Sequence, residues 1–330
     1  MGNILQYSVW ANCCNACDFC LRKERIPYSK EKQLKRLERI KKNLDYIDWQ
    51  GKFSDGISLL GGELYFIEDL ELQGSFLELI DLIIEKVLKV SPNPNVKYST
   101  VTNGLYNPDF LIKVLDKIVD ACGTKAIDLN FSYDLRHRYK SEEDRLKVIN
   151  NVNLIHERYD YCIGIQMILT QHVINKWKEG YDVVKHIEEV MPGNQLCLLY
   201  PHPIHTGKKL DDFFFKRPDL FSFLAWLREN YQFEYASFMQ STFNSATYKW
   251  TGLKDIHKDN ITTQPKLTDG KEEITDCESD CVINLKGHWR QYDSERGILN
   301  QYDLKDMSVY SSKEQEVNGK SLVLSEEDRA

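Results

Sequence analysis

Residues 13 to 20 read Cys13-Cys14-Asn15-Ala16-Cys17-Asp18-Phe19-Cys20 and hold four of the nine cysteines of the chain. Three of these, Cys13, Cys17 and Cys20, have the spacing C-x3-C-x2-C. Thiolates are soft, strongly donating ligands for iron, and three from one short loop can bind three corners of a cubane 4Fe–4S cluster. The fourth iron then has no protein ligand, which leaves a position where a reactant can coordinate. The stretch therefore predicts a catalytic iron–sulphur site.

Two other interpretations of this stretch stay open. A zinc knuckle would need a fourth ligand close by, and no His or Cys follows Cys20 until Cys122. A shifted register, Cys14-x2-Cys17-x2-Cys20, would use Cys14 in place of Cys13. The odd number of cysteines argues against a disulfide framework. The C-x3-C-x2-C register fits the stretch best.

Outside the cysteine stretch, apolar runs alternate with segments of helical periodicity. Six runs are predicted to be strands: Leu5–Trp10, Gly56–Leu60, Lys97–Thr102, Ala126–Tyr133, Tyr161–Leu169 and Gln195–Tyr200. Six segments are predicted to be helices: Lys30–Ile47, Phe76–Val90, Pro108–Asp120, Ser141–Tyr159, Lys176–Val190 and Pro218–Tyr231.

Strand–helix alternation of this kind predicts an α/β fold, with parallel strands joined by right-handed crossovers. Six units are too few to close an eight-fold barrel, so we expect an open, partial (β/α)6 barrel resembling a TIM barrel, followed by a small irregular C-terminal extension. Chemistry in parallel α/β folds gathers at the C-terminal ends of the strands. The cysteine stretch and the motifs described below all follow predicted strands.

Charge and hydropathy limit the classes of partner. The chain has 330 residues and a formal net charge of −7, so no broad nucleic-acid-binding surface is expected. No apolar run reaches the roughly 18–20 residues that span a bilayer, and residues 1–10 do not resemble a signal peptide. We therefore expect a cytoplasmic protein with no membrane partner.

The cysteine spacing, together with Phe19 directly before the last cysteine, resembles the signature of the radical S-adenosylmethionine (SAM) superfamily. The resemblance covers about residues 5–230. It implies that Cys13, Cys17 and Cys20 bind a 4Fe–4S cluster whose open iron chelates SAM. It also implies that reduction cleaves SAM to methionine and a 5′-deoxyadenosyl radical, which takes a hydrogen atom from a substrate.

The same resemblance assigns SAM-binding roles to residues that follow the predicted strands. Gly61-Gly62-Glu63 is similar to the family's GGE segment, which holds the methionine amino group, although Leu64 replaces the usual proline. Thr102-Asn103-Gly104 and Ser132-Tyr133-Asp134 are similar to family segments that line the SAM pocket. The cofactor-binding residues expected in this way are Phe19, Gly61, Gly62, Glu63, Asn103, Ser132, Asp134 and Arg145, of which Arg145 is expected to pair with the SAM carboxylate. Gln166, in the fifth predicted strand, is expected either to point inward, where it can meet adenosine or substrate, or to be an outward-facing residue of that strand. His202 and His205, after the sixth strand, are expected either to reach a substrate or to shape a proline-rich turn.

The C-terminal region resembles the SPASM or twitch extension of radical SAM enzymes. Cys277 and Cys281 precede a predicted short hairpin with Gly287 at its turn, but Tyr292 stands where a further cysteine would be expected. Three interpretations stay open: a metal-free remnant, a zinc site that includes His288, or an auxiliary cluster completed by Cys197 or a non-cysteine ligand. We expect residues 1–231 to form the radical SAM core, 232–310 this extension, and 311–330 a polar tail.

The resemblance thus predicts a radical SAM enzyme that receives electrons from an external donor such as flavodoxin or ferredoxin. The SPASM-like region favours a peptide or protein substrate, and a nucleoside or other small metabolite is the alternative. A prediction of a different class is a non-enzymatic iron–sulphur or zinc protein that senses redox state or binds a partner. Such a sensor would not require the Gly61–Glu63 segment.

Overall fold

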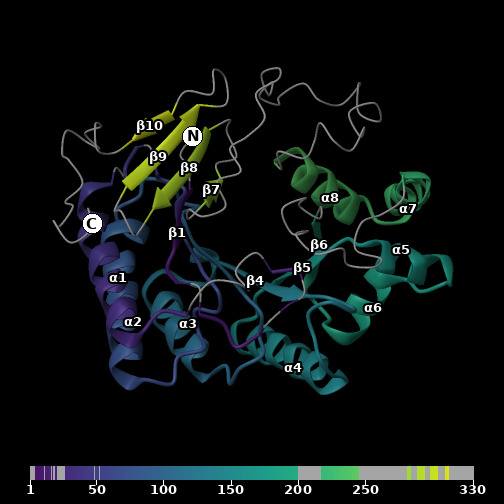
Figure 1. Cartoon of the computed structure of the whole chain (residues 1–330), viewed down its shortest axis with the longest axis horizontal. Coiled ribbons are helices and arrows are strands. Elements are labelled where there is room, and N and C mark those ends of the chain that lie inside the picture. The colour runs from purple at the N-terminus through teal and green to yellow at the C-terminus, as the bar shows by residue number, and fades with distance from the viewer. Residues whose placement is uncertain are drawn as a thin grey trace.

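The computed structural model describes residues 4–5, 7, 9–10, 12–15, 17, 19–20, 27–45, 47, 49–51, 53–199 and 218–238, together with the backbone of 6, 8, 46, 217, 239–244, 281–283, 288–293, 298–303 and 309–311. Within these residues a curved, six-stranded parallel sheet forms the centre of the molecule (Figure 1). Its strands are β1 (Ile4–Ser8), β2 (Gly56–Leu60), β3 (Lys97–Thr102), β4 (Ile127–Tyr133), β5 (Gly164–Ile168) and β6 (Gln195–Leu199).

The strands lie in chain order, so β1 and β6 form the two edges of the sheet. Each pair is parallel, as in the register of Ser132 beside Gln166 and of Gln166 beside Cys197. The connections contain helices α1 (Lys30–Asn43), α2 (Leu70–Ile83), α3 (Asp109–Cys122), α4 (Glu142–Tyr159), α5 (Gln171–Lys178) and α6 (Val183–Val190), which lie along one side of the sheet (Figure 1). Three single turns are added: η1 (Leu44–Tyr46), η2 (Ile84–Leu88) and η3 (Thr124–Ala126). The prediction of an open α/β barrel is confirmed.

The alternation of side chains along β4 explains why the sheet has one dry face and one polar face. Ile127, Leu129, Phe131 and Tyr133 are buried, whereas the residues between them are half-buried. Successive side chains of a strand point to opposite faces, so one set packs under the helices and the other faces the inside of the partial barrel. Ser132 and Gln166 therefore lie on the inner face.

Local signals in the sequence set the ends of α4. Its first turn is acidic, and the Ser141 hydroxyl accepts a hydrogen bond from Asp144 N at 3.1 Å, as a capping residue does. The helix ends at Asp160, which adopts the left-handed conformation with φ of 46°.

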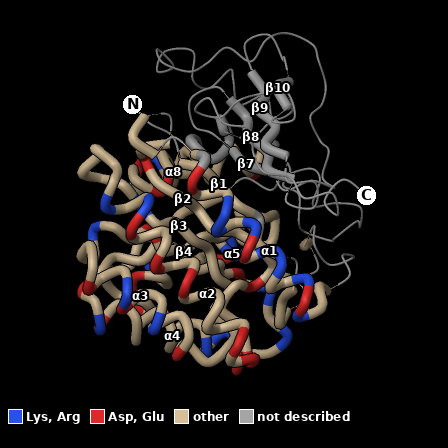
Figure 2. Tube along the Cα trace, turned by 90° about the vertical axis from the view of Figure 1, so that its left-hand side faces the viewer, with Lys and Arg blue, Asp and Glu red and all other residues tan. Residues whose placement is uncertain are grey.

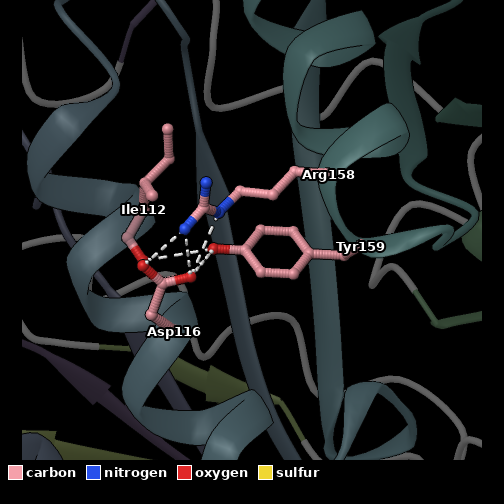
Figure 3. A network of polar contacts seen from close by, with 4 residues as sticks. All are labelled: Ile112, Asp116, Arg158 and Tyr159. Carbon is pink, nitrogen blue, oxygen red and sulfur yellow. Dashed lines mark hydrogen bonds and ion pairs between the residues drawn. The ribbon is translucent and has the colours of Figure 1, made fainter.

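An ion-pair network joins α3 to α4 on the outer side of the molecule (Figure 3). The guanidinium of Arg158 donates to both carboxylate oxygens of Asp116, with Nη2 3.0 Å from each. The Tyr159 hydroxyl lies 2.7 Å from Asp116 Oδ1 and 3.2 Å from Ile112 O. Acidic and basic positions are interspersed over this helical layer (Figure 2). Exposed pairs of this kind stabilise a fold only slightly.

The prediction of one helix over Lys176–Val190 is wrong, since two helices occupy this part of the chain. The first, α5, begins earlier, where the Thr170 hydroxyl accepts from Val173 N. Gly180 then adopts φ of 92°, which a side chain would disfavour, and Asp182 caps the start of α6. A glycine in a helical pattern is compatible with a continuous helix or with a break, and here the first helix ends before Gly180.

Among the described residues from 232 on there are a helix and four strands, where an irregular extension was expected. Helix α7 (Arg217–Asn230) is followed directly by α8 (Gln232–Asn244), and Gln195 Nε2 of β6 donates to Glu234 of α8 at 2.7 Å. Strands β7 (Cys281–Ile283), β8 (His288–Asp293), β9 (Ile298–Asp303) and β10 (Val309–Ser311) form an antiparallel sheet. The β7–β8 pair corresponds to the predicted hairpin. No helix among the described residues is long and apolar enough to cross a membrane.

Candidate functional site

The cysteine stretch forms part of the loop that leaves β1 at the C-terminal edge of the sheet. Asn12 holds the two ends of this loop together, because its side chain donates to Tyr28 O at 3.0 Å and accepts from Tyr28 N at 2.8 Å. Backbone bonds join the start of the loop to the segment after β2, with Gly62 N 2.8 Å from Trp10 O and Glu63 N 2.7 Å from Asn12 O. The start of the cysteine loop and the segment after β2 therefore lie side by side at this edge of the sheet.

The loop extends across this edge to the far strands. Cys17 and Phe19 are each 6% exposed and pack against Ile168 at the end of β5, with Leu199 of β6 and Cys20 beside them. Neither Ile168 nor Leu199 was singled out from the sequence, because nothing in an apolar strand shows which of its residues will contact a distant loop. Cys17 consequently lies in a largely apolar surrounding.

Polar N–H groups approach the sulphur atoms of the cysteines. The Asn103 side-chain nitrogen, after β3, lies 3.4 Å from Cys13 Sγ and 3.5 Å from Cys14 Sγ. The Asn15 backbone nitrogen lies 3.4 Å from Cys13 Sγ, and its side-chain nitrogen lies 3.4 Å from Cys17 Sγ. Arg138 Nη1 lies 3.7 Å from Cys17 Sγ. Donors of this kind stabilise negative charge on sulphur.

The thiols differ in acidity because their neighbours differ. A hydrogen bond with Cys14 lowers the pKa of the Cys13 thiol, and the same bond raises the pKa of Cys14. Burial raises the pKa of Cys17 to about 11, although the positive charge of Arg138 acts in the opposite direction. None of the described cysteines forms a disulfide.

The Gly61-Gly62-Glu63 segment contacts the cysteine loop closely. A Cβ atom at Gly61 would lie 2.9 Å from Trp10 O and would also collide with the Leu64 side chain. A glycine is therefore required at position 61 for the two segments to approach as they do. Leu64, at the position where the resembled GGE segment usually has proline, is fully buried and forms part of the core.

Glu63 is 1% exposed and lies between the ends of β2 and β3. One carboxylate oxygen accepts from the Thr102 hydroxyl at 2.9 Å and from Tyr65 N at 3.3 Å, and the other accepts from Asn103 N at 2.7 Å. Burial raises the pKa of this carboxyl to about 8, against the effect of these hydrogen bonds. No described Lys or Arg forms an ion pair with it, so its negative charge has no counterion among the described side chains.

Asp134 is 2% exposed and organises the loop between β4 and α4. Its Oδ1 accepts from the backbone nitrogens of Arg136 at 2.7 Å and Arg138 at 3.2 Å, and also from that of His137. Because of this turn, Arg138 is held against the cysteine loop. Arg138 was not identified from the sequence, and its signal was no more than a basic residue in the loop after a strand.

The described contacts of Arg145, which was predicted to pair with the SAM carboxylate, are with other protein groups. Its Nη2 pairs with Glu142 at 2.8 Å, and its charge faces Tyr133, Tyr181 and His186. The Tyr133 side chain belongs to the helix-covered face of β4, opposite Ser132. The structure thus brings Asn103 and the Gly61–Glu63 segment to the described part of the cysteine loop, but not Arg145.

Several predicted positions lie outside the residues that the structure describes. These include His202, His205 and Cys277, and only the backbone is described at Cys281 and His288. Among the described residues, no three His, Cys, Asp or Glu side chains gather as they would around a single metal ion.

The donor set fits an iron–sulphur cluster. Three cysteines stand on one loop, and N–H groups of Asn103 and Arg138, from other segments, lie at the sulphurs of Cys13 and Cys17. Cys17 also has the apolar surrounding of Phe19, Ile168 and Leu199. A cubane spreads its thiolate ligands over separate irons, so the three cysteines need not converge on a single ion. The uncompensated buried carboxylate of Glu63 fits a ligand with an ammonium group.

Comparisons with known proteins yield similarities of structure alone. No protein-family profile and no curated protein matches the sequence. The crystal structure of SuiB from Streptococcus suis aligns over 69% of this chain and 46% of that chain, with 16% identity and a TM-score of 0.44. The structure of SuiB bound to S-adenosylmethionine aligns over 68% and 46%, with 17% identity and a TM-score of 0.43. The chain aligns with less than half the length of these structures.

Proposed function

We propose that this chain is a radical SAM enzyme, in which Cys13, Cys17 and Cys20 hold a 4Fe–4S cluster and the strand ends beside them bind SAM. The observation that carries the proposal is the position of the cysteine loop. It lies over the C-terminal edge of a parallel α/β sheet, where such folds concentrate their chemistry, with polar N–H groups aimed at its sulphur atoms. Cys13, Cys17 and Cys20 would hold the cluster, which would supply the electron for reductive cleavage of SAM and thereby the means of hydrogen abstraction from a substrate.

The residues of this chain bind and orient the reactants in the proposed reaction. The Glu63 carboxylate accepts an ammonium group, because a buried anion without a counterion is costly and a ligand cation relieves that cost. Gly61 and Gly62 let the backbone approach the ligand closely, and Asn103 lies between Glu63 and the sulphurs of Cys13 and Cys14. Phe19 helps to exclude water from the Cys17 side of the loop.

The remaining SAM contacts are proposed on the resemblance. Ser132 and Gln166 are neighbours on the inner face of the sheet, and Asp134 lies at the same edge. For Arg145 we propose the role that the resemblance assigns, which is to pair with the SAM carboxylate. In the structure its ion pair is with Glu142. Cys277 and Cys281 are proposed as a second site that is metal-free, holds zinc or holds an auxiliary cluster.

The substrate proposed is a peptide or protein, on the SPASM-like spacing of Cys277 and Cys281, with a nucleoside or other small metabolite as the alternative. The electron donor proposed is a flavodoxin or a ferredoxin. Peptides encoded beside the gene and a panel of nucleosides can be compared for their ability to accelerate SAM cleavage. Acceleration by nucleosides alone would contradict the peptide proposal.

Anaerobic reconstitution with iron and sulphide, followed by SAM and dithionite, tests the proposed function. We expect about four irons in the Cys13–Cys20 site per chain and formation of 5′-deoxyadenosine. The Cys17→Ala variant should lose both, whereas Cys162→Ala, which removes an exposed cysteine elsewhere, should retain both. A complete cluster with no 5′-deoxyadenosine would instead support the non-enzymatic redox sensor, and zinc in place of iron would contradict the cluster.

A further inference from the structure

The β4–α4 loop has a fixed shape that serves the cysteine loop. Asp134 Oδ1 accepts three backbone N–H groups, those of Arg136, His137 and Arg138. An aspartate that closes a turn in this way restricts the backbone of the residues that follow it. The position of Arg138 is therefore set by the loop itself.

Arg138 contacts three groups of the cysteine loop. Its Nη1 lies 3.7 Å from Cys17 Sγ, and its guanidinium carbon lies 5.1 Å from the centre of the Phe19 ring. Its carbonyl oxygen accepts from the Asn15 side chain at 2.9 Å, and that same nitrogen lies 3.4 Å from Cys17 Sγ. Arg138 thus directs a positive charge and one N–H group at Cys17, and it positions Asn15, which supplies a second N–H group.

These contacts have a definite effect on an iron–sulphur cluster bound at Cys17. Reduction adds negative charge to the cluster and its ligand sulphurs, so N–H donors and a nearby cation stabilise the reduced form more than the oxidised form. Cys17 and Phe19 are each 6% exposed, and poor solvent screening strengthens the interaction. The effect acts on the reduction potential and needs no contact with SAM.

We propose that Arg138 is a positioning residue that raises the reduction potential of the cluster through Cys17. The inference rests on the proposed function, because it requires that Cys17 ligates the cluster. The family pattern did not indicate Arg138, whose proposed interaction is with the ligand sulphur of Cys17.

The experiment compares reconstituted full-length protein without SAM, so that ligand binding cannot alter the result. The potential is measured by anaerobic titration followed by electron paramagnetic resonance. We expect Arg138→Met to give a more negative potential than the wild type and Arg138→Lys, which keeps the charge, to lie between them. Arg136→Met is the matched control, since Arg136 is exposed in the same loop and its charge faces His172.

Equal potentials for Arg138→Met and the wild type would overturn the inference, as would an equal shift in Arg136→Met, which would indicate an effect of net charge alone. If Arg138→Met binds less iron than the wild type, the potential of Arg138→Gln is measured instead, because this variant keeps an N–H donor and loses only the charge. The inference requires that Arg138→Gln also have a lower potential than the wild type. A wild type that binds no cluster would contradict the proposed function instead, so the two failures are distinguishable.

Discussion

Replacement of Asp134 tests whether one side chain holds the β4–α4 loop. Asp134→Ala removes the acceptor of three backbone N–H groups, and of the residues that donate them only His137 is buried. Leaving a buried donor unsatisfied costs about 1–3 kcal/mol, and losing each of the other two bonds, where water can substitute, costs roughly 1 kcal/mol. We therefore expect Asp134→Ala to lower the free energy of unfolding by about 3–5 kcal/mol.

Asp134→Asn is the matched comparison, because it keeps an acceptor oxygen and removes only the charge. Neutral hydrogen bonds are roughly half as strong as charge-assisted ones, so we expect a loss of about 1–2 kcal/mol. Urea unfolding of the cluster-free protein, followed by circular dichroism under anaerobic conditions, measures both variants. Equal losses for Ala and Asn, or a loss below about 1 kcal/mol for Ala, would refute the reasoning.

A second aspartate, which contacts none of the described cysteines, provides a control. Asp182 caps α6 by accepting from the backbone nitrogens of Val184 and Lys185, at 3.1 and 3.0 Å. Asp182→Ala should also destabilise the protein, but it should leave the reduction potential of the cluster unchanged. Asp134→Ala frees the loop that holds the Arg138 guanidinium near Cys17, but it also removes an anion whose charge acts on Cys17 in the opposite direction. We therefore expect a smaller negative shift of the potential than in Arg138→Met.

Three further outcomes follow from the site. Cys13→Ala should abolish cluster binding and Cys14→Ala should not, as measured by iron content; the reverse result would select the shifted register. Gly61→Ala should destabilise the protein and weaken SAM binding, since its Cβ would collide with Trp10 O, and calorimetric titration with SAM measures the second effect. In the cluster-free protein, the raised pKa of Glu63 makes the folded state bind a proton that the unfolded state has lost. The unfolding free energy should therefore fall by up to about 1.4 kcal/mol per pH unit between the ordinary pKa of 4.5 and about 8. Glu63→Gln should remove that slope. An unchanged slope would show that Glu63 is not the group whose pKa is raised on folding.

The sequence was sufficient for the fold because local signals agree with the global arrangement. The predicted bounds of β2 and β3 coincide with those of the structure, since both strands are apolar or alternating runs that end at turn residues. The boundary between α5 and α6 was missed because Gly180 in a helical pattern does not reveal whether its φ will be negative or positive.

The features of the site also divide into those that the sequence reveals and those that only the fold determines. Cysteine spacing and the Gly61–Glu63 segment are short-range patterns, and short-range patterns can be recognised in one sequence. The contacts of the loop with Ile168, Leu199 and Arg138 join residues more than a hundred positions apart. No periodicity in the chain encodes which side chain of a strand end will meet a loop from the opposite edge of the sheet.

The choice between two arginines illustrates this limit. Arg145 lies in the first turn of α4, where the spacing i, i+3 places it beside Glu142, and the helix directs it to the outer layer. Arg138 precedes the helix, and its direction depends on the three bonds that Asp134 makes to the loop. Family resemblance could therefore suggest an arginine in this part of the chain, but only the conformation of the loop determines which arginine reaches Cys17. Asp134 sets the position of the Arg138 guanidinium, four residues farther along the chain, because its carboxylate holds the backbone of the loop that carries Arg138.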